Sequence, residues 1–207
     1  LVILSKYKLS SLLIDGDPIN TSILNRFNKC FLKTDSIAID KWITEENINS
    51  IISKYVKEFE IDLLSIDIDG NDYWIWKAID CVNPRVVCIE YNASFYNHSI
   101  TVPYENDFDR SNFIHEPKKQ MWYHGASLEA LHKLAKRKKY VLIGTDSCGV
   151  NAFFMKKEIA EQFGFREMST KEAFRDHRSR ATGQITGLTL SSEEQFDFIK
   201  NKKFINV

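Results

Sequence analysis

Residues 63–79, LLSIDIDGNDYWIWKAI, join an apolar run to two carboxylates and a segment with two tryptophans. The apolar run ends at Asp67, a second carboxylate follows at Asp69, and Gly70 precedes the amphipathic segment. This order indicates a buried strand, a tight turn and a short helix over residues 72–80. Two acids at the end of a buried strand also mark this place as a candidate site.

The same alternation of strand-like and helical patterns extends to both sides. Strands are expected at 11–15, 29–33, 61–67, 85–91, 140–145 and 151–157, and helices at 19–27, 43–59, 72–80 and 127–139. This alternation predicts an α/β fold with a mostly parallel sheet and one antiparallel strand near the C-terminal edge.

We expect two parts in the chain, an α/β domain over residues 1–163 and a polar helical extension over 164–207. The irregular, aromatic-rich residues 93–122 are a candidate lid within the first part, because a segment of that length without a periodic pattern often closes over a ligand.

Composition and charge exclude some classes of function. Lys+Arg and Asp+Glu number 28 each, so electrostatics give no reason to expect nucleic acid as the main partner. No apolar stretch approaches the roughly 18 residues of a membrane span. We find neither a signal peptide nor a CxxC pair among the four cysteines, and therefore expect a cytoplasmic protein. A homodimer is left open.

Acids close three of the expected strands. Asp15 ends the first strand in LLIDGDP, Asp67 ends another, and Glu90 is followed by Asn92 at the end of the next. Ligands of open α/β sheets bind beyond the carboxyl ends of the strands. A carboxylate such as Asp15 can accept both hydroxyls of a ribose, and Gly16 would let the chain turn close to it. The alternatives are a turn for Asp15 and a helix cap for Asp69 or Asn71.

The motifs that carry these acids resemble those of one enzyme family. The matching stretches are LLIDGDP, LSIDIDG, IDGNDYWIWKAI, PRVVCIEYN, HGASLEALHKLAKRKKYVLIG and GVNAFF, in that order between residues 10 and 157. Together they are similar to class I S-adenosylmethionine-dependent methyltransferases of the FkbM type. The resemblance implies a Rossmann-like methyltransferase sheet whose last strand is antiparallel. It also implies O-methylation of a sugar or small-molecule hydroxyl in glycan or natural-product biosynthesis.

The resemblance also implies roles for particular residues. Asp15, Gly16, Asp17 and Asp67 would bind S-adenosylmethionine, with Asp15 on the ribose and Asp67 beside the methyl group. Asp69 stands where the family pattern has Glu, and Glu90, Tyr91 and Asn92 would face the acceptor. The family carries a glycine-rich turn after its first strand, and this chain has none. The N-terminal strand–turn–helix is therefore expected to be missing.

The catalytic residues that we predict are Asp69, Glu90 and His124. His124, in MWYHGAS, is the candidate base for the acceptor proton, although a surface or capping histidine is an equal alternative. A divalent metal ion on Asp67, Asp69, Glu90 and Asn92 is a variant of the mechanism. Three further functions stay open: a non-catalytic binding module of the same fold, a metal-dependent DxD glycosyltransferase, and a phosphatase.

Overall fold

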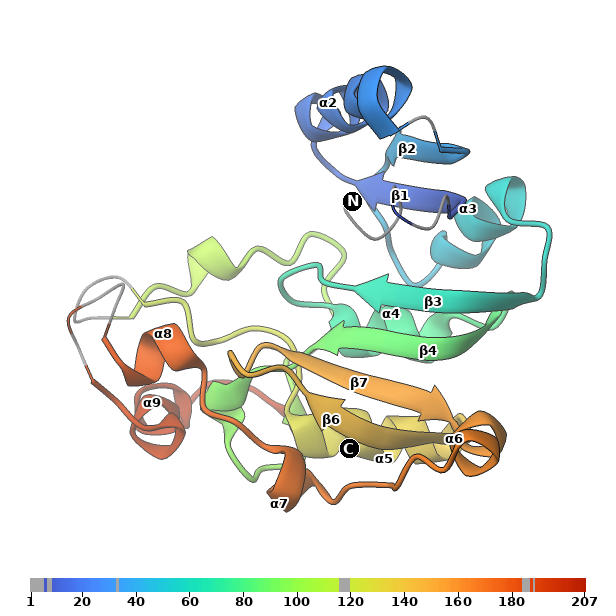
Figure 1. The fold of residues 1–207 in the computed structure, drawn as a ribbon. Helices are drawn as coiled ribbons and strands as arrows, with labels where there is room; N and C mark the ends of the chain where they lie inside the picture. Colours follow the sequence, from blue (N-terminus) through green and yellow to red (C-terminus); the bar gives the residue numbers. More distant parts are fainter. Residues whose placement is uncertain (1–5, 7–8, 33, 116–119, 184–186, 188) are drawn as a thin grey trace. The chain divides into compact units, whose positions relative to one another are not determined.

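The computed structural model describes residues 6, 9–32, 34–115, 120–183, 187 and 189–207 (Figure 1). The chain divides into two compact units. Unit 1 holds the described residues up to Phe59 together with Ala78–Val82, and unit 2 holds Glu60–Lys77 with the described residues from Asn83 onward. The division that we predicted at residue 164 stays a prediction.

Unit 1 is built on two parallel strands, β1 (Ser11–Asp15) and β2 (Ser36–Asp40). The connection between them contains α2 (Pro18–Phe27) and a π-helical turn, η1 (Asn28–Leu32), and α3 (Ile48–Tyr55) follows β2. Helix α2 begins where the sequence favours it, because the Asp17 carboxylate accepts a hydrogen bond from the Ile19 backbone N–H and Pro18 occupies the first turn.

The strand predicted at 29–33 is wrong for its described residues, since η1 occupies 28–32; residue 33 lies outside the described residues. Cys30 and Phe31 are exposed, so this apolar run is not buried as a strand would be. The side-chain amide of Asn28 instead donates to the Thr34 and Ser36 carbonyls, and the strand starts at Ser36.

Unit 2 contains a four-stranded mixed sheet in the order β3–β4–β7–β6 (Figure 1). Its strands are β3 (Glu60–Ile66), β4 (Asn83–Glu90), β6 (Tyr140–Thr145) and β7 (Asn151–Lys156). Strands β3 and β4 are parallel, whereas β7 pairs antiparallel with both β4 and β6. The helices of this part are α4 (Asp72–Ala78), α5 (Leu128–Arg137) and α6 (Lys157–Phe163).

The structure corrects the fold class that we expected. The chain is α/β, but its described strands form small sheets, and no extended, mostly parallel Rossmann-like sheet is present among them. The antiparallel β7 lies between β4 and β6, so the larger sheet is mixed at its centre and not only at an edge. The two strands joined by residues 146–150 form a tight antiparallel return, which needs no helical crossover.

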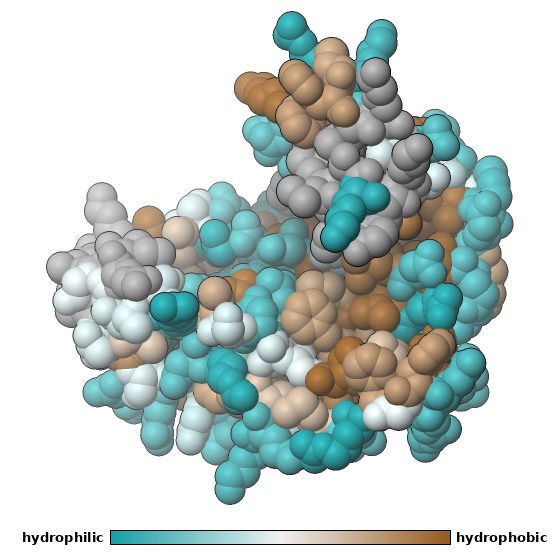
Figure 2. All heavy atoms as spheres, viewed as in Figure 1, coloured by the Kyte–Doolittle hydropathy of each residue, from teal (hydrophilic) through white to brown (hydrophobic). Residues whose placement is uncertain are grey.

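Helix α4 packs an aromatic side chain against one face of the mixed sheet. The ring of Trp76 lies 5.1 Å from that of Phe154 on β7 and 6.0 Å from that of Tyr140 on β6. Both Trp76 and its neighbour Ile75 are buried. On the other face, α6 packs Ala160 against Val141 and Met155, whereas Leu63 on β3 stays 58% exposed. Figure 2 shows apolar side chains gathered at the molecular surface in this view.

The remaining elements of unit 2 are short. They are η2 (Ala93–Phe95), β5 (Ile100–Thr101), η3 (Arg110–Asn112), α7 (Thr170–Ala173), α8 (Arg178–Ala181), α9 (Ser192–Ile199) and β8 (Ile205–Asn206). Strands β5 and β8 pair antiparallel, and a second hydrophobic core joins Phe95, Trp122 and Tyr123 to Ile199 of α9. Phe95 and Trp122, which belong to the described part of the predicted lid, therefore pack against the C-terminal residues. Among the described residues, no helix is long and apolar enough to span a bilayer.

Candidate functional site

The site lies where β3 and β4 end, and the strand register explains why. The two strands are parallel and pair Ile66 with Ile89, so Asp67 and Glu90 each follow one residue later at the same edge of the sheet. One ligand oxygen from each of Asp67, Asp69 and Glu90 lies within 4.8 Å of the other two. We call these three residues the acidic cluster.

The loop after β3 is shaped by a carboxylate that the sequence analysis did not select. Asp72 is fully buried, and its two oxygens accept 3.0 Å hydrogen bonds from the backbone N–H groups of Ile68 and Gly70. Between them, Asp69 adopts a left-handed backbone conformation with φ 58°. A Cβ on Gly70 would lie 2.2 Å from the Phe108 ring, so only glycine fits there. These contacts fix where Asp69 lies.

Glu90 is the least exposed member of the acidic cluster. Its side chain is 11% exposed, and its Oε2 atom is buried without a hydrogen-bond partner among the described residues. Burial, and then the negative charge of Asp69, raise the pKa of the Glu90 carboxyl to about 7. Partial burial, followed by the charge of Glu90, likewise raises the pKa of Asp67. Glu90 can therefore both hold and release a proton near neutral pH.

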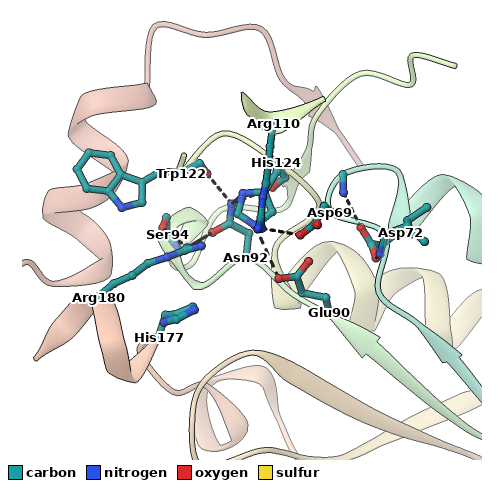
Figure 3. Close-up of polar contacts among 12 residues, drawn as sticks. Asp69, Asp72, Glu90, Asn92, Ser94, Arg110, Trp122, His124, His177 and Arg180 are labelled. Atoms are coloured by element: carbon teal, nitrogen blue, oxygen red, sulfur yellow. Dashed lines mark hydrogen bonds and ion pairs between the residues drawn. The ribbon is translucent and has the colours of Figure 1, made fainter. Parts of the chain in front are cut away.

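His124 lies beside Glu90, as Figure 3 shows, and its Nε2 atom is 3.8 Å from Glu90 Oε1. The ring is almost fully buried, at 1% exposure. Burial, and then the positive charges of Arg180 and Arg110, lower the pKa of His124 to about 3. The imidazole is therefore neutral at pH 7, and Glu90 is better matched than His124 to take a proton from an acceptor.

The side chain of Asn92 forms hydrogen bonds that stabilise this edge of the sheet, and it is not suited to bind a metal ion. Its side-chain amide donates to the Trp122 carbonyl at 2.6 Å and to the His124 carbonyl at 2.8 Å. Its Oδ1 atom accepts a bond from the Ser94 backbone N–H at 3.0 Å. Asn92 therefore ties the end of β4 to the segment that carries His124, and has little capacity left for a metal ion.

Two arginines complete the site, and each comes from a segment without a periodic sequence pattern. Arg110 of η3 contacts Asp69, with 2.5 Å between Nη1 and Oδ1. Arg180 of α8 donates from Nη1 to Asn92 Oδ1 at 3.3 Å and to Ser94 Oγ at 3.1 Å. Figure 3 shows both guanidinium groups reaching toward the region of Glu90 and His124.

The predicted cofactor residues of unit 1 form a hydrogen-bonded turn between β1 and α2. Asp15 Oδ1 accepts from the Asp17 backbone N–H at 2.8 Å, and Oδ2 accepts from the Asn20 side chain at 3.2 Å. Asp17 caps α2. A Cβ on Gly16 would lie 3.0 Å from the ring of Trp42, so the backbone passes close to an aromatic side chain there.

Of the predicted site residues, the structure brings Asp67, Asp69, Glu90 and His124 together in unit 2. Asp15, Gly16 and Asp17 form the turn after β1 in unit 1. Three residues of the site were not predicted from the sequence: Asp72, Arg110 and Arg180. The first carried a usable signal, because an Asp within a DGND turn at a helix start commonly accepts backbone N–H bonds. No signal of that kind marks the two arginines.

None of the protein-family models, curated proteins and solved structures compared with the chain matches it. Function is therefore inferred from the chemistry of the site and from the sequence motifs.

Proposed function

We propose that the protein is an S-adenosylmethionine-dependent methyltransferase that methylates a hydroxyl of a sugar or other small molecule. The acidic edge of the mixed sheet is its acceptor site in this proposal. The observation that carries it is Glu90, whose buried Oε2 has no partner among the described residues while neutral His124 lies beside Oε1. A carboxylate in that state suits a hydroxyl that must lose its proton during transfer.

The chemistry of Asp15 supports the cofactor. Each oxygen of this carboxylate accepts one hydrogen bond within unit 1, which leaves lone-pair capacity on both for a pair of vicinal hydroxyls. The strand-end position and the LLIDGDP motif support a nucleoside as the owner of those hydroxyls. Asp15 and Gly16 would hold the ribose, and Asp17 would support the turn as the cap of α2.

The residues at the acceptor site would have the following roles. Glu90 accepts the proton of the acceptor hydroxyl and later releases it to water. Asp69 is held by Arg110, and its charge contributes to the raised pKa of Glu90. Asp67 lies at the same edge and would face the methyl donor. When bound, S-adenosylmethionine supplies an electrophilic methyl group, and its S–CH₃ bond breaks as the O–CH₃ bond forms.

A second candidate function follows from the spacing of the acidic cluster. Three carboxylate oxygens within 4.8 Å of one another suit a hard divalent cation such as Mg²⁺. Such an ion would favour a metal-assisted methyltransferase, a DxD glycosyltransferase or a phosphatase. Arg110 already places a positive charge on Asp69, which competes with a cation for that oxygen. Calorimetric titration with MgCl₂ and MnCl₂ distinguishes the two, and heat that disappears in Asp69→Asn favours the metal.

Titration calorimetry with S-adenosylmethionine and S-adenosylhomocysteine tests the proposed function. The protein, expressed from its complete reading frame, is expected to bind both, and Asp15→Ala is expected to lose them. The matched control is Asp62→Ala, since the side chain of Asp62 is 85% exposed and lies in unit 2, where it forms an ion pair with Arg85. Absence of binding in the native protein would instead favour a non-catalytic binding module.

A further inference from the structure

We propose that Arg180 binds an oxyanion, a carboxylate or a phosphate, that the acceptor carries next to the hydroxyl held by Glu90. This inference deepens the proposed function, because it gives the acceptor an acidic character. It concerns binding at the edge of unit 2, and that binding does not depend on which group is transferred.

Arg180 combines partial burial with the lack of an ion pair to any described carboxylate, whereas other arginines without an ion pair, such as Arg137 and Arg175, are exposed. Arg85, Arg110 and Arg166 each form an ion pair with a carboxylate. Arg180 forms no ion pair with the described residues, and within that part of the chain its side chain donates only from Nη1, to the neutral oxygens of Asn92 and Ser94. A guanidinium carries five N–H donors, and those on Nε and Nη2 have no partner among the described residues, so they can serve a ligand.

An unpaired positive charge on Arg180 is energetically unfavourable in its surroundings. Burial, which outweighs the attraction of Glu90, lowers the pKa of its guanidinium to about 10. The side chain therefore stays charged at neutral pH while it is largely withdrawn from water. A charge in such surroundings is normally compensated by an opposite charge. A ligand oxyanion would supply that compensation, and a guanidinium matches a carboxylate or phosphate with two parallel bonds.

The segment that carries Arg180 is held firmly against the sheet. The Arg178 backbone N–H donates to the Cys148 carbonyl at 2.8 Å in the β6–β7 turn. Upstream, the Tyr91 hydroxyl at the end of β4 donates to the Arg175 carbonyl at 2.7 Å. The Asp176 carboxylate accepts from the Ser192 hydroxyl at 2.6 Å. Three separate contacts therefore fix the segment that leads to Arg180.

The groups that bind Arg180 are positioned as well. Ser94 is fully buried and donates from its hydroxyl to Gln195 Oε1 of α9 at 2.6 Å. Asn92 is fixed by the carbonyls of Trp122 and His124. Figure 3 shows Arg180 on one side of the site and Glu90 on the other. One molecule with a hydroxyl and a neighbouring oxyanion satisfies both, and acidic sugars have that pattern.

Equilibrium binding of sugar probes, measured by calorimetry without methyl donor, tests this inference. The probes are D-glucuronate, D-glucose 6-phosphate and neutral D-glucose at millimolar concentrations. We expect the native protein to bind at least one acidic probe about ten-fold more tightly than D-glucose, and the preferred one identifies the oxyanion. Arg180→Ala is expected to remove that preference, and Arg180→Lys to keep part of it, since the charge remains but the planar fork is lost.

The control variant is Arg166→Ala, which removes an exposed ion pair with Glu172 and should leave the preference unchanged. Circular dichroism and thermal melting check that each variant is folded. If Arg180→Ala does not fold, the preference of the native protein for acidic probes still tests the inference. Equal affinity for acidic and neutral probes, no binding of any acidic probe, or an unchanged preference in folded Arg180→Ala overturns the inference. Failure to bind S-adenosylmethionine with this preference intact overturns only the proposed function.

Discussion

At the scale of single residues, Glu90 links stability to function. Its carboxyl has a pKa of about 7 in the folded chain against an ordinary value of 4.5, because burial and Asp69 disfavour the ionised form. The unfolded chain releases this proton near pH 4.5, whereas the folded chain keeps it to about pH 7. The stabilising contribution is therefore complete below pH 4.5 and is lost as the pH rises through 7.

Glu90→Gln should remove this pH dependence, since the amide does not ionise. We expect the free energy of unfolding of the native protein to fall between pH 5 and pH 8 by on the order of 2 kcal/mol more than that of the variant. Urea denaturation at the two pH values measures the difference, and Asp62→Asn is the exposed-acid control. Parallel pH profiles for native and Glu90→Gln would mean that Glu90 ionises as an ordinary carboxylate.

Asp72 gives a second prediction at this scale. Asp72→Asn keeps the side-chain shape but sets an amide N–H₂ group against one of two backbone donors, those of Ile68 and Gly70. An unmade buried hydrogen bond costs about 1–3 kcal/mol, and the thermal melting temperature should fall accordingly. Methyl transfer should also weaken, because Asp69 is held between those two bonds. A variant with native melting and native activity would show that Asp72 does not shape the loop.

The three carboxylates of the acidic cluster could be predicted from sequence, whereas Asp72 and the two arginines were not. Asp67 and Glu90 end apolar runs of strand length, and the ends of neighbouring parallel strands meet at one edge. Arg110 and Arg180 come from short elements, η3 and α8, in irregular or polar stretches. Their positions depend on tertiary contacts over long sequence separations, such as the bond between Arg180 and Ser94.

At the scale of secondary-structure elements, α8 depends on the β6–β7 turn. Gly149 has φ 70°, and a Cβ there would lie 2.2 Å from the Asp176 carbonyl oxygen. Gly164 has the same φ, but a Cβ would meet nothing within 4 Å. The two glycines therefore share the backbone strain of an alanine substitution and differ only in the clash.

Gly149→Ala should destabilise the protein more than Gly164→Ala, for which we expect only the left-handed backbone cost of about 1 kcal/mol. Because the clash pushes on the segment that carries Arg180, Gly149→Ala should also lose the preference for acidic probes, and Gly164→Ala should keep it. Thermal melting and calorimetry of the two variants provide the comparison. Equal losses of stability in the two variants would contradict this prediction, because they would mean that the segment around Asp176 moves away from residue 149 at no cost in free energy.

Elements with a clear pattern were found, but not always at the predicted length: of the helix predicted at 43–59, only Ile48–Tyr55 forms a helix, α3. The strand predicted at 11–15 is β1, and the helix predicted at 127–139 contains α5, which Ser127 caps through its bond to the Ala130 N–H. In the strand-like run at 29–33, Cys30 and Phe31 are exposed, and the actual strand, SIAID at 36–40, was not predicted. Burial, which decides such cases, is a property of the tertiary structure.

At the scale of the whole molecule, the alternation of strands and helices correctly indicated an α/β chain but not its sheets. Alternation favours parallel strands only where each connection crosses over through a helix. The return from β6 to β7 uses a tight turn, and β7 inserts between β4 and β6. Strand order depends on such pairing, which a single sequence does not encode in any local pattern.

The central claim is that Glu90 takes the acceptor proton in a methyl transfer. Single-turnover transfer of a radiolabelled methyl group from S-adenosylmethionine to hydroxyl acceptors, in native protein and in Glu90→Gln, tests it most directly. We predict transfer by the native protein, and a loss of about 10²–10⁴-fold in Glu90→Gln with unchanged affinity for S-adenosylmethionine. Equal transfer rates in the two proteins, or no transfer by native protein to any acidic or neutral sugar, would contradict it.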